Sequence, residues 1–330
     1  MIIMEKEVIR TRKLNKTFKL KQKEAGMLGS IKALIRTKTK KIVAVNNISL
    51  SINEGEMVAF IGPNGAGKST TIKMLIGILY PSSGDIKVLG MTPWKERKKL
   101  AYKVGSVFGQ KPQLWYHLPA IDTFNLLGKI YSIEKKEYEK RLKELVELFE
   151  IQDIINTPVR KLSLGQRMKC ELVGALINKP EVLLLDEPTI GLDIIAKQKI
   201  RELIRELNEK EKITVLLTSH DTQDIERLCN RAIIINNGRI VYDGKISELN
   251  KRYLNNKIID VKFKSQFKGI EIKGAKIIKQ GKYHAVFEIN TKKIKIKDFI
   301  DEIIEKYEIL DINISGTPIE EVITKIYKEK

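Results

Sequence analysis

The sequence predicts an α/β fold built on a mainly parallel sheet, and three stretches of the chain carry that prediction. Residues 57–61 form an apolar run that is followed by a glycine-rich turn and by residues 71–79, which favour a helix. Residues 182–187 and 213–218 contain two further apolar runs of strand length. Continuous apolar runs of this kind are typical of parallel strands that are buried on both faces. We therefore expect these runs to be strands of one core sheet.

The glycine-rich turn reads Gly-Pro-Asn-Gly-Ala-Gly-Lys-Ser-Thr and matches the pattern G-x-x-x-x-G-K-S in full. Its glycines let the backbone curl so that N–H groups converge on phosphate oxygens, and the positive end of the next helix faces the same point. Lys68 can reach the β- and γ-phosphates, and the Ser69 hydroxyl can hold Mg²⁺. The flanking strand and helix disfavour the alternative, a turn with an incidental lysine. The predicted nucleotide-binding residues here are Gly62, Pro63, Asn64, Gly65, Ala66, Gly67, Lys68, Ser69 and Thr70.

Two acidic residues end the second apolar run. The strand delivers Asp186 to the same sheet edge as the glycine-rich turn, where its carboxylate can bind Mg²⁺ through water. Glu187, one residue on, can polarise an attacking water molecule as a general base. An ordinary acidic strand end is the alternative, and the pairing with the phosphate loop disfavours it. The two motifs together predict hydrolysis of a nucleotide.

Residues 162–166, Leu-Ser-Leu-Gly-Gln, open a helix that extends to about residue 178. Ser163 and Gly165 lie where a helix N-terminus offers a hydroxyl and free N–H groups to an anion. The surrounding segment, about 111–180, is helical in pattern, so this loop lies on a helical subdomain away from its own phosphate loop. We therefore expect it to cap the nucleotide of a second copy.

The chain divides into two predicted domains. Residues 1–248 form the larger one, with the core sheet, an antiparallel edge sheet and the helical subdomain at about 111–180 inserted into the core. Near residue 250 the pattern changes to three strands, a helix, a strand and a final helix at 318–327. That order predicts a small α+β accessory or regulatory domain at 249–330.

Half of the net charge of +20 lies in residues 1–41, which hold 13 Lys and Arg against 3 Asp and Glu. Within a basic insertion at about 19–41, the stretch 26–37 has apolar residues at helical spacing, which predicts a short basic amphipathic helix. Such a helix can rest on anionic lipid or on a membrane protein, or it can cover the chain's own edge strand. The apolar positions are Met27, Leu28, Ile31, Leu34 and Ile35.

The sequence favours a cytosolic chain. Its apolar runs are all much shorter than the ~20 residues of a membrane span, and residues 1–6 do not contain the apolar region of a signal peptide. Cys170 and Cys229 do not have the spacing of metal ligands, so we expect two buried, reduced thiols.

These motifs, in this order, resemble the ATP-binding cassette of ABC transporters over about residues 6–245. The phosphate loop matches that of the cassette, and residues 162–166 match its signature loop, with Leu164 where glycine is commonest. The resemblance implies that Glu187 is the catalytic glutamate. It also implies that Gln110 is the glutamine that joins the α/β core to the helical subdomain.

Further residues take roles through the same resemblance. His220 matches the histidine that senses the γ-phosphate, with a polar strand end as the alternative. Residues 191–193, Gly-Leu-Asp, match the loop across the dimer seam. Phe18 is the aromatic residue available to stack on adenine, with a core position as the alternative. The implied catalytic residues are Glu187, His220 and Gln110; the nucleotide contacts add Phe18, Ser163, Gly165, Gln166 and Asp193; the implied Mg²⁺ ligands are Ser69, Gln110 and Asp186.

The resemblance implies an ATPase with a P-loop cassette that powers an ABC transporter, in an exporter branch similar to drug-efflux ATPases. Two copies, or this chain and a homologous cassette, would bind ATP and Mg²⁺ between the phosphate loop of one and the signature loop of the other. The implied partners are polytopic membrane permease subunits, and the implied location is the cytoplasmic face of the membrane, as a peripheral subunit.

Two other functions remain as alternatives to a transporter subunit. The positive charge would suit a soluble cassette ATPase that acts on a ribosome or a nucleic-acid assembly. Relatives of that kind usually carry two cassettes or long coiled coils, and this chain has neither, so we expect no nucleic-acid partner. A binding module without turnover conflicts with the intact Glu187 and His220.

Overall fold

The computed structural model describes residues 6–22, 38–109, 112–253, 256–316, 322–323 and 326–327. The chain forms two compact units, Met1–Asp243 and Gly244–Lys330. Gln110, the predicted amphipathic helix at 26–37 and most of the predicted helix at 318–327 lie outside the described residues. Within those described ranges, no helix is both long enough and apolar enough to cross a membrane.

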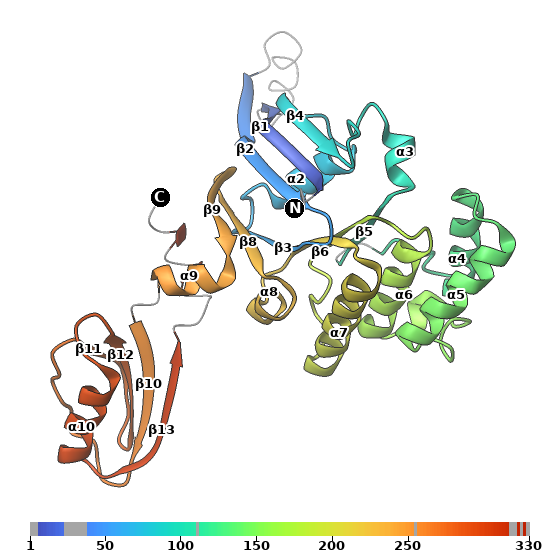
Figure 1. The fold of residues 1–330 in the computed structure, drawn as a ribbon. Coiled ribbons are helices and arrows are strands. Elements are labelled where there is room, and N and C mark those ends of the chain that lie inside the picture. The colour runs from blue at the N-terminus through green and yellow to red at the C-terminus, as the bar shows by residue number, and fades with distance from the viewer. Residues whose placement is uncertain are drawn as a thin grey trace, which may run out of the picture. The chain divides into compact units, whose positions relative to one another are not determined.

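A six-stranded sheet forms the centre of the first unit, in the order β5-β6-β7-β3-β8-β9 (Figure 1). β3 pairs in parallel with β7 and β8, and β6 pairs in parallel with β5 and β7. The carboxyl ends of these strands therefore share one edge, where open α/β sheets bind their ligands. The strands are β3 (Met57–Ile61), β5 (Val104–Phe108), β6 (Val182–Asp186), β7 (Thr214–Thr218), β8 (Arg231–Asn236) and β9 (Arg239–Lys245).

A three-stranded antiparallel sheet in the order β2-β1-β4 lies beside this core. Ile9 of β1 lies opposite both Ile52 and Val88, and these three side chains are buried. The pairing of β1 with β4 stops early, whereas β1 and β2 stay paired as far as Gln22 and Lys38. The strand pair therefore extends into the basic insertion from both ends. The strands are β1 (Glu7–Gln22), β2 (Lys38–Asn53) and β4 (Ser83–Val88).

The helices of the first unit include the predicted helical subdomain. Between residues 112 and 180 the described chain forms helices and no strand, and the buried Leu145 and Phe149 on α5 follow helical spacing. Two short helices, α3 and α8, are too brief for hydropathy periodicity to predict. The helices are α2 (Lys68–Leu75), α3 (Arg97–Ala101), α4 (Ala120–Ile130), α5 (Lys135–Phe149), the 3₁₀ helix η1 (Val159–Lys161), α6 (Leu164–Leu176), α7 (Ile194–Glu211) and α8 (Thr222–Leu228).

One hydrophobic core joins the edge sheet, β3 and α2. Its fully buried members include Ile9 and Ile52 from the edge sheet, Phe60 from β3, and Ile72 and Leu75 from α2. Burial of each such side chain stabilises the fold by about 1.5–3 kcal/mol. The strand and the helix on either side of the phosphate loop are therefore fixed in one packed body, and the predicted fold class is confirmed.

Both cysteines are buried free thiols, as predicted. Burial raises the pKa of Cys170 to about 12 and moves the pKa of Cys229 in the same direction. Both thiols therefore stay neutral near pH 7 and act as small apolar side chains.

The second unit folds around a four-stranded antiparallel sheet in the order β11-β12-β10-β13. α10 packs on one face of this sheet, where Phe299 meets Phe287 edge to face with ring centroids 5.1 Å apart. The order of strands and helix is that of the small α+β unit predicted from the sequence. The elements are α9 (Ile246–Tyr253), β10 (Asn256–Phe263), β11 (Ala275–Gln280), β12 (His284–Asn290), α10 (Ile296–Lys306) and β13 (Ile309–Gly316).

Candidate nucleotide-binding site

The phosphate loop, residues 62–70, joins β3 to α2 and lies against two neighbouring backbone segments. A Cβ atom on Gly62 would come 2.5 Å from the carbonyl oxygen of Ile235, and one on Gly67 would come 2.3 Å from that of Ala44. Gly67 also has a φ of +105°, which L side chains rarely adopt. Glycine at these positions therefore lets the loop curl tightly between its neighbours, as phosphate binding requires.

Lys68 is the first residue of α2, and only 7% of its surface is exposed. Its ammonium group donates hydrogen bonds to the carbonyl oxygens of Gly62 and Pro63. Burial lowers the pKa of Lys68, and the negative charges of Glu187 and Asp186 oppose that change. The lysine thus lies over its own loop as a partly desolvated cation beside the two predicted acidic residues.

Asp186 connects the phosphate loop to the core sheet. Its Oδ2 accepts a hydrogen bond from the Ser69 hydroxyl at 3.2 Å, and its Oδ1 accepts one from the Thr218 hydroxyl at 2.6 Å. Asp186 and Thr218 are register partners at the carboxyl ends of β6 and β7. Sequence analysis missed Thr218, although its place at the end of an apolar run just before His220 was a usable signal.

The contact between Ser69 and Asp186 fits a Mg²⁺ site. Mg²⁺ prefers oxygen ligands and takes one or two from protein, with the rest from phosphates and water. In the part of the chain that the structure describes, no group of three or more His, Cys, Asp or Glu side chains could hold a metal. Mg²⁺ bound by Ser69 and Asp186 would take its remaining ligands from phosphate and water, as is usual for this ion. Gln110, the third predicted ligand, lies outside the described residues.

Glu187 occupies a tight turn directly after β6. Its φ is +57°, a left-handed value that few glutamates adopt. Its backbone N–H donates to the carbonyl oxygen of Thr218 at 3.0 Å, and a Cβ atom on Gly109 would come 2.1 Å from its carbonyl oxygen. Its Oε1 lies 3.1 Å from Nε2 of His220. The structure thus holds the predicted catalytic glutamate in an unusual backbone conformation and brings it to the predicted histidine.

The signature loop, residues 162–166, forms the N-terminus of α6. Ser163 caps the helix, with its Oγ accepting from the backbone N–H of Gln166 at 3.2 Å. In return the Oε1 atom of Gln166 accepts from the backbone N–H of Ser163 at 2.9 Å, which completes a capping box. Both side chains act as acceptors in this box, so the Ser163 hydroxyl proton and the Gln166 amide protons can donate elsewhere.

The loop at residues 191–193 lies beside the signature loop. A Cβ atom on Gly191 would lie 3.0 Å from Cδ2 of Leu164, and one on Gly165 would lie 3.0 Å from Cβ of Ala196. Asp193 caps α7, since its Oδ1 accepts from the backbone N–H of Ala196 at 2.8 Å. Within the described residues, no hydrogen bond or ion pair joins these two loops to the phosphate loop of the same chain.

Phe18 lies on β1, opposite Ile42 of β2, and its ring is partly exposed. The ammonium nitrogen of Lys16 lies 5.2 Å from the ring centroid, a cation–π contact that the sequence analysis did not predict. Ala44, two residues beyond Ile42 on the same strand, is the residue packed against Gly67. The strand pair that carries Phe18 therefore borders the phosphate loop.

Comparison with known proteins places this geometry in a family. The family model described as ABC transporter matches residues 45–190. The ABC transporter ATP-binding protein NatA of Bacillus subtilis (strain 168) is 35% identical over 212 residues, which are 64% of this chain and 86% of that protein. Nod factor export ATP-binding protein I of Rhizobium leguminosarum bv. viciae is 35% identical over 219 residues, which are 66% of this chain and 70% of that protein.

A solved structure agrees with these relatives. It is a dimer of an ATP-binding cassette in a post-hydrolysis state, bound to ADP and Pi, and it matches with a TM-score of 0.60 at 27% identity over 72% of this chain and 98% of that chain. The relatives are ATP-binding proteins named for transport, so the alternative of a soluble ATPase is not favoured. The chain belongs to the ABC transporter family, as an ATP-binding and ATP-hydrolysing subunit.

Proposed function

We propose that this chain drives export, as a peripheral subunit at the cytoplasmic face of the membrane. The relative named for Nod factor export supports the direction of transport. The observation that carries the catalytic part is the convergence of three strand ends, because Ser69 follows β3, Glu187 follows β6 and His220 follows β7. The membrane pathway itself belongs to polytopic permease subunits, which the chain would engage and move.

The chemistry proposed for these residues depends on position and charge. Glu187 acts as the general base that accepts a proton from the attacking water. His220, with Nε2 3.1 Å from the Glu187 carboxylate, steadies that carboxylate and meets the γ-phosphate. Lys68 exchanges its contacts with loop carbonyls for the β- and γ-phosphate oxygens. The strained turn keeps Glu187 in place without an adjustment during the reaction.

Ser69 and Asp186 would hold Mg²⁺ together with Gln110. When bound, the cation neutralises charge on the phosphates and fixes their orientation. The hydrogen bond between Thr218 and Asp186 leaves Oδ2 of that carboxylate toward the Ser69 hydroxyl, so Thr218 orients this ligand pair. Phe18 would stack on the adenine ring from the strand pair beside the loop.

A second copy, or a homologous cassette, would complete each ATP site. Ser163, Gly165 and Gln166 would donate to the γ-phosphate of the opposite chain, with Asp193 at the seam. Ile194 and Ile195, which follow Asp193, are 81% and 83% exposed. Apolar side chains this exposed at the start of a helix support an interface that covers them.

The permease is expected to contact the beginning of the helical subdomain. Trp115 and Tyr116 are 47% and 48% exposed there, and Leu118 is 41% exposed. Large amphipathic side chains of this kind anchor protein interfaces. The basic insertion at 19–41 would add contact with anionic lipid, since Lys19 and Lys41 are exposed at its described ends. The second unit would serve as an accessory or regulatory domain.

The test of the proposed function is the variant Glu187→Gln. It keeps the size of the side chain and removes the base, so ATP binding should be intact while hydrolysis slows by roughly 10²–10⁴. Because the bound ATP persists, the variant should also form an ATP-dependent dimer. The measurements are equilibrium ATP binding, steady-state phosphate release and size-exclusion chromatography with and without ATP.

Glu181→Gln is the matched control. Glu181 immediately precedes β6, at the opposite end of the strand from Glu187, and pairs with the exposed Lys103. Exposed pairs contribute little to stability, so this variant should hydrolyse ATP at the normal rate. Near-normal turnover by Glu187→Gln would remove that residue from its proposed role.

A further inference from the structure

The helices α6 and α7 both begin at loops that the proposed function assigns to the nucleotide of a second copy. α6 begins directly after Ser163, and α7 begins directly after Asp193. Their starting ends touch, because Gly165 of α6 packs on Ala196 of α7 and Gly191 packs on Leu164. The relative position of the two loops therefore depends on how the two helices are aligned.

A single arginine joins the opposite ends of these helices. Arg141 of α5 is 5% exposed, and its Nη1 and Nη2 atoms donate to the two carboxylate oxygens of Glu211 at 2.6 and 2.9 Å. Its Nε and Nη2 atoms also donate to the carbonyl oxygen of Leu176 at 3.3 and 3.2 Å. Leu176 is the last residue of α6, and Glu211 is the last residue of α7. One guanidinium thus holds both carboxyl ends.

The chemistry of these contacts favours arginine over other cations. The carbonyl oxygens at a helix end have no partner within the helix and carry its negative dipole end. A planar guanidinium can bind a carboxylate with two parallel bonds and still donate to a carbonyl oxygen. Lysine offers a single nitrogen in this position, so it cannot hold both helix ends in the same geometry.

A second and weaker tie links the end of α5 to α6 and α7. Glu150, which follows α5, accepts a bond from Lys199 of α7 at 2.7 Å and forms an ion pair with Lys169 of α6 at 3.6 Å. Glu150 and Lys199 are exposed, and exposed pairs contribute little energy. Of these two polar ties between the helices, the buried Arg141 is therefore the stronger.

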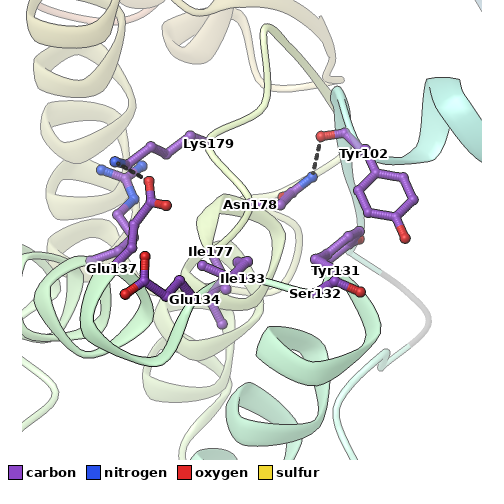
Figure 2. A pocket seen from close by; sticks show the side chains of 10 residues that line it. Tyr102, Tyr131, Ser132, Ile133, Glu134, Glu137, Ile177, Asn178 and Lys179 are labelled. Atoms are coloured by element: carbon purple, nitrogen blue, oxygen red, sulfur yellow. Dashed lines mark hydrogen bonds and ion pairs between the residues drawn. The ribbon is translucent and has the colours of Figure 1, made fainter.

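Two pockets that open to solvent flank Arg141 near the end of α6. A pocket of about 390 Å³ lies on one side, lined by Arg141 together with Tyr102, Tyr131 and Asn178. Figure 2 shows Tyr102, Tyr131 and Asn178 around this pocket. A second cavity of about 450 Å³ is lined by Arg141 and Glu211. Leu176 itself is fully buried, so apolar packing holds the end of α6 on the core. The guanidinium adds directed hydrogen bonds that set this end relative to the end of α7.

We propose that Arg141 is a positioning residue that, with Glu211, aligns α6 with α7 so that the signature loop and residues 191–193 meet the second copy's nucleotide together. The inference rests on the proposed trans-capping of that nucleotide. α6 has 13 residues, so it is about 20 Å long, and a tilt of about 10° moves its far end by about 3 Å. Misplacement by about 1 Å is enough to impair a catalytic arrangement.

The test compares Arg141→Lys and Glu211→Ala, each in the full-length chain and each also combined with Glu187→Gln. ATP affinity of the monomer should stay within about twofold, because the phosphate loop is untouched. The ATP concentration needed for dimerisation should rise about tenfold or more, and the KM for ATP should rise with it because hydrolysis requires the dimer. The kcat should also fall, because the two loops no longer meet the nucleotide together. Glu211→Ala leaves the guanidinium with the carbonyl oxygen of Leu176 and a longer ion pair to Glu144 at 3.8 Å. This variant serves if Arg141→Lys does not fold.

Glu206→Ala is the matched control, since Glu206 lies on the same helix and pairs with the exposed Lys210. It should leave dimerisation and turnover unchanged. Normal dimerisation by folded Arg141→Lys or Glu211→Ala protein would overturn the inference, and so would a loss of monomer ATP affinity in step with dimerisation. The Glu187→Gln protein without a second substitution tests the proposed function by itself. If that protein failed to dimerise with ATP, both the proposed function and the inference about Arg141 would be overturned.

Discussion

Gly65 and Gly67 of the phosphate loop differ in how much space a side chain would have. Gly67 has a positive φ and the carbonyl oxygen of Ala44 at 2.3 Å from its Cβ position. Gly65 also has a positive φ, +81°, but nothing lies within 4 Å of its Cβ position. The two positions therefore separate the effect of backbone strain from the effect of a steric clash.

We predict that Gly67→Ala loses ATP binding by about 100-fold or more, whereas Gly65→Ala loses about tenfold. Gly65→Ala adds only the strain of a left-handed residue, about 1–2 kcal/mol. Gly67→Ala adds a clash with backbone that cannot rotate away, so the loop must open. Equilibrium ATP binding on both variants checks this, with melting temperature as a guard against unfolding. Equal losses would mean that Ala44 does not shape the loop.

At the level of single residues, the sequence predicts candidates wherever the chemistry is local. The residues Lys68 and Ser69 come from one short stretch whose spacing alone indicates phosphate binding. Thr218 escaped prediction because its bond to Asp186 spans 32 positions of sequence. A hydroxyl at a strand end has many uses, and only the register of β6 and β7 selects this one.

The N-terminus of α6 combines a structural and a functional demand on one side chain. Ser163 must accept a hydrogen bond to cap the helix, and in the proposed dimer it must donate one to a phosphate. Aspartate can meet the first demand as well as serine does, but its negative charge repels phosphate. Threonine can meet both.

We predict that Ser163→Asp loses ATP-driven dimerisation while its helix and its monomer ATP affinity stay intact. Cap strength should change by less than about 1 kcal/mol. Ser163→Thr is the control that should dimerise, and Lys68→Ala is the contrasting variant that should lose affinity in the monomer. Size-exclusion chromatography with ATP, in the Glu187→Gln background, measures the outcome. Weaker ATP binding by Ser163→Asp monomers would refute trans-capping.

Among the elements, those with a long periodic pattern were predictable and the short ones were not. α7 begins directly after Asp193, which is a strong N-cap in front of an apolar stripe, and such a pattern marks the start of a helix. α3 and α8, with five and seven residues, are too short for such a pattern. The paired strands β1 and β2 extend further into the basic insertion than their apolar residues indicate, because backbone pairing needs no apolar side chain.

For the molecule as a whole, the positive charge of the basic insertion predicts binding to anionic membranes. Lys19, Lys40 and Lys41 are exposed on the paired strands where they enter the insertion. Each lysine near an anionic surface contributes about 1 kcal/mol, and salt screens that attraction. We predict that the chain binds vesicles containing anionic lipid at low salt and that glutamine at these three positions weakens the binding about tenfold or more.

The control variant has glutamine at Lys95, Lys98 and Lys99, so it loses the same total charge. Lys98 and Lys99 lie on α3 and Lys95 lies just before it, and all three are exposed. Co-sedimentation with anionic and with neutral vesicles, at two salt concentrations, measures binding of the full chain. Equal weakening by both triple variants would point to net charge rather than the insertion. Binding that ignores vesicle charge would rule out the lipid contact.

The sequence by itself determined the motifs of this protein and their order: a strand, a glycine-rich loop and a helix, which predict phosphate binding; an acidic strand end, which predicts Mg²⁺ and water; and a capped helix start, which predicts a second anion. These are local patterns, and a few adjacent residues specify each of them. Only the tertiary structure decided which neighbours exclude a side chain at Gly67 and which residue aligns α6 with α7. Arg141 and Glu211 are 70 positions apart, so their bond exists only because folding brings the middle of α5 to the ends of α6 and α7.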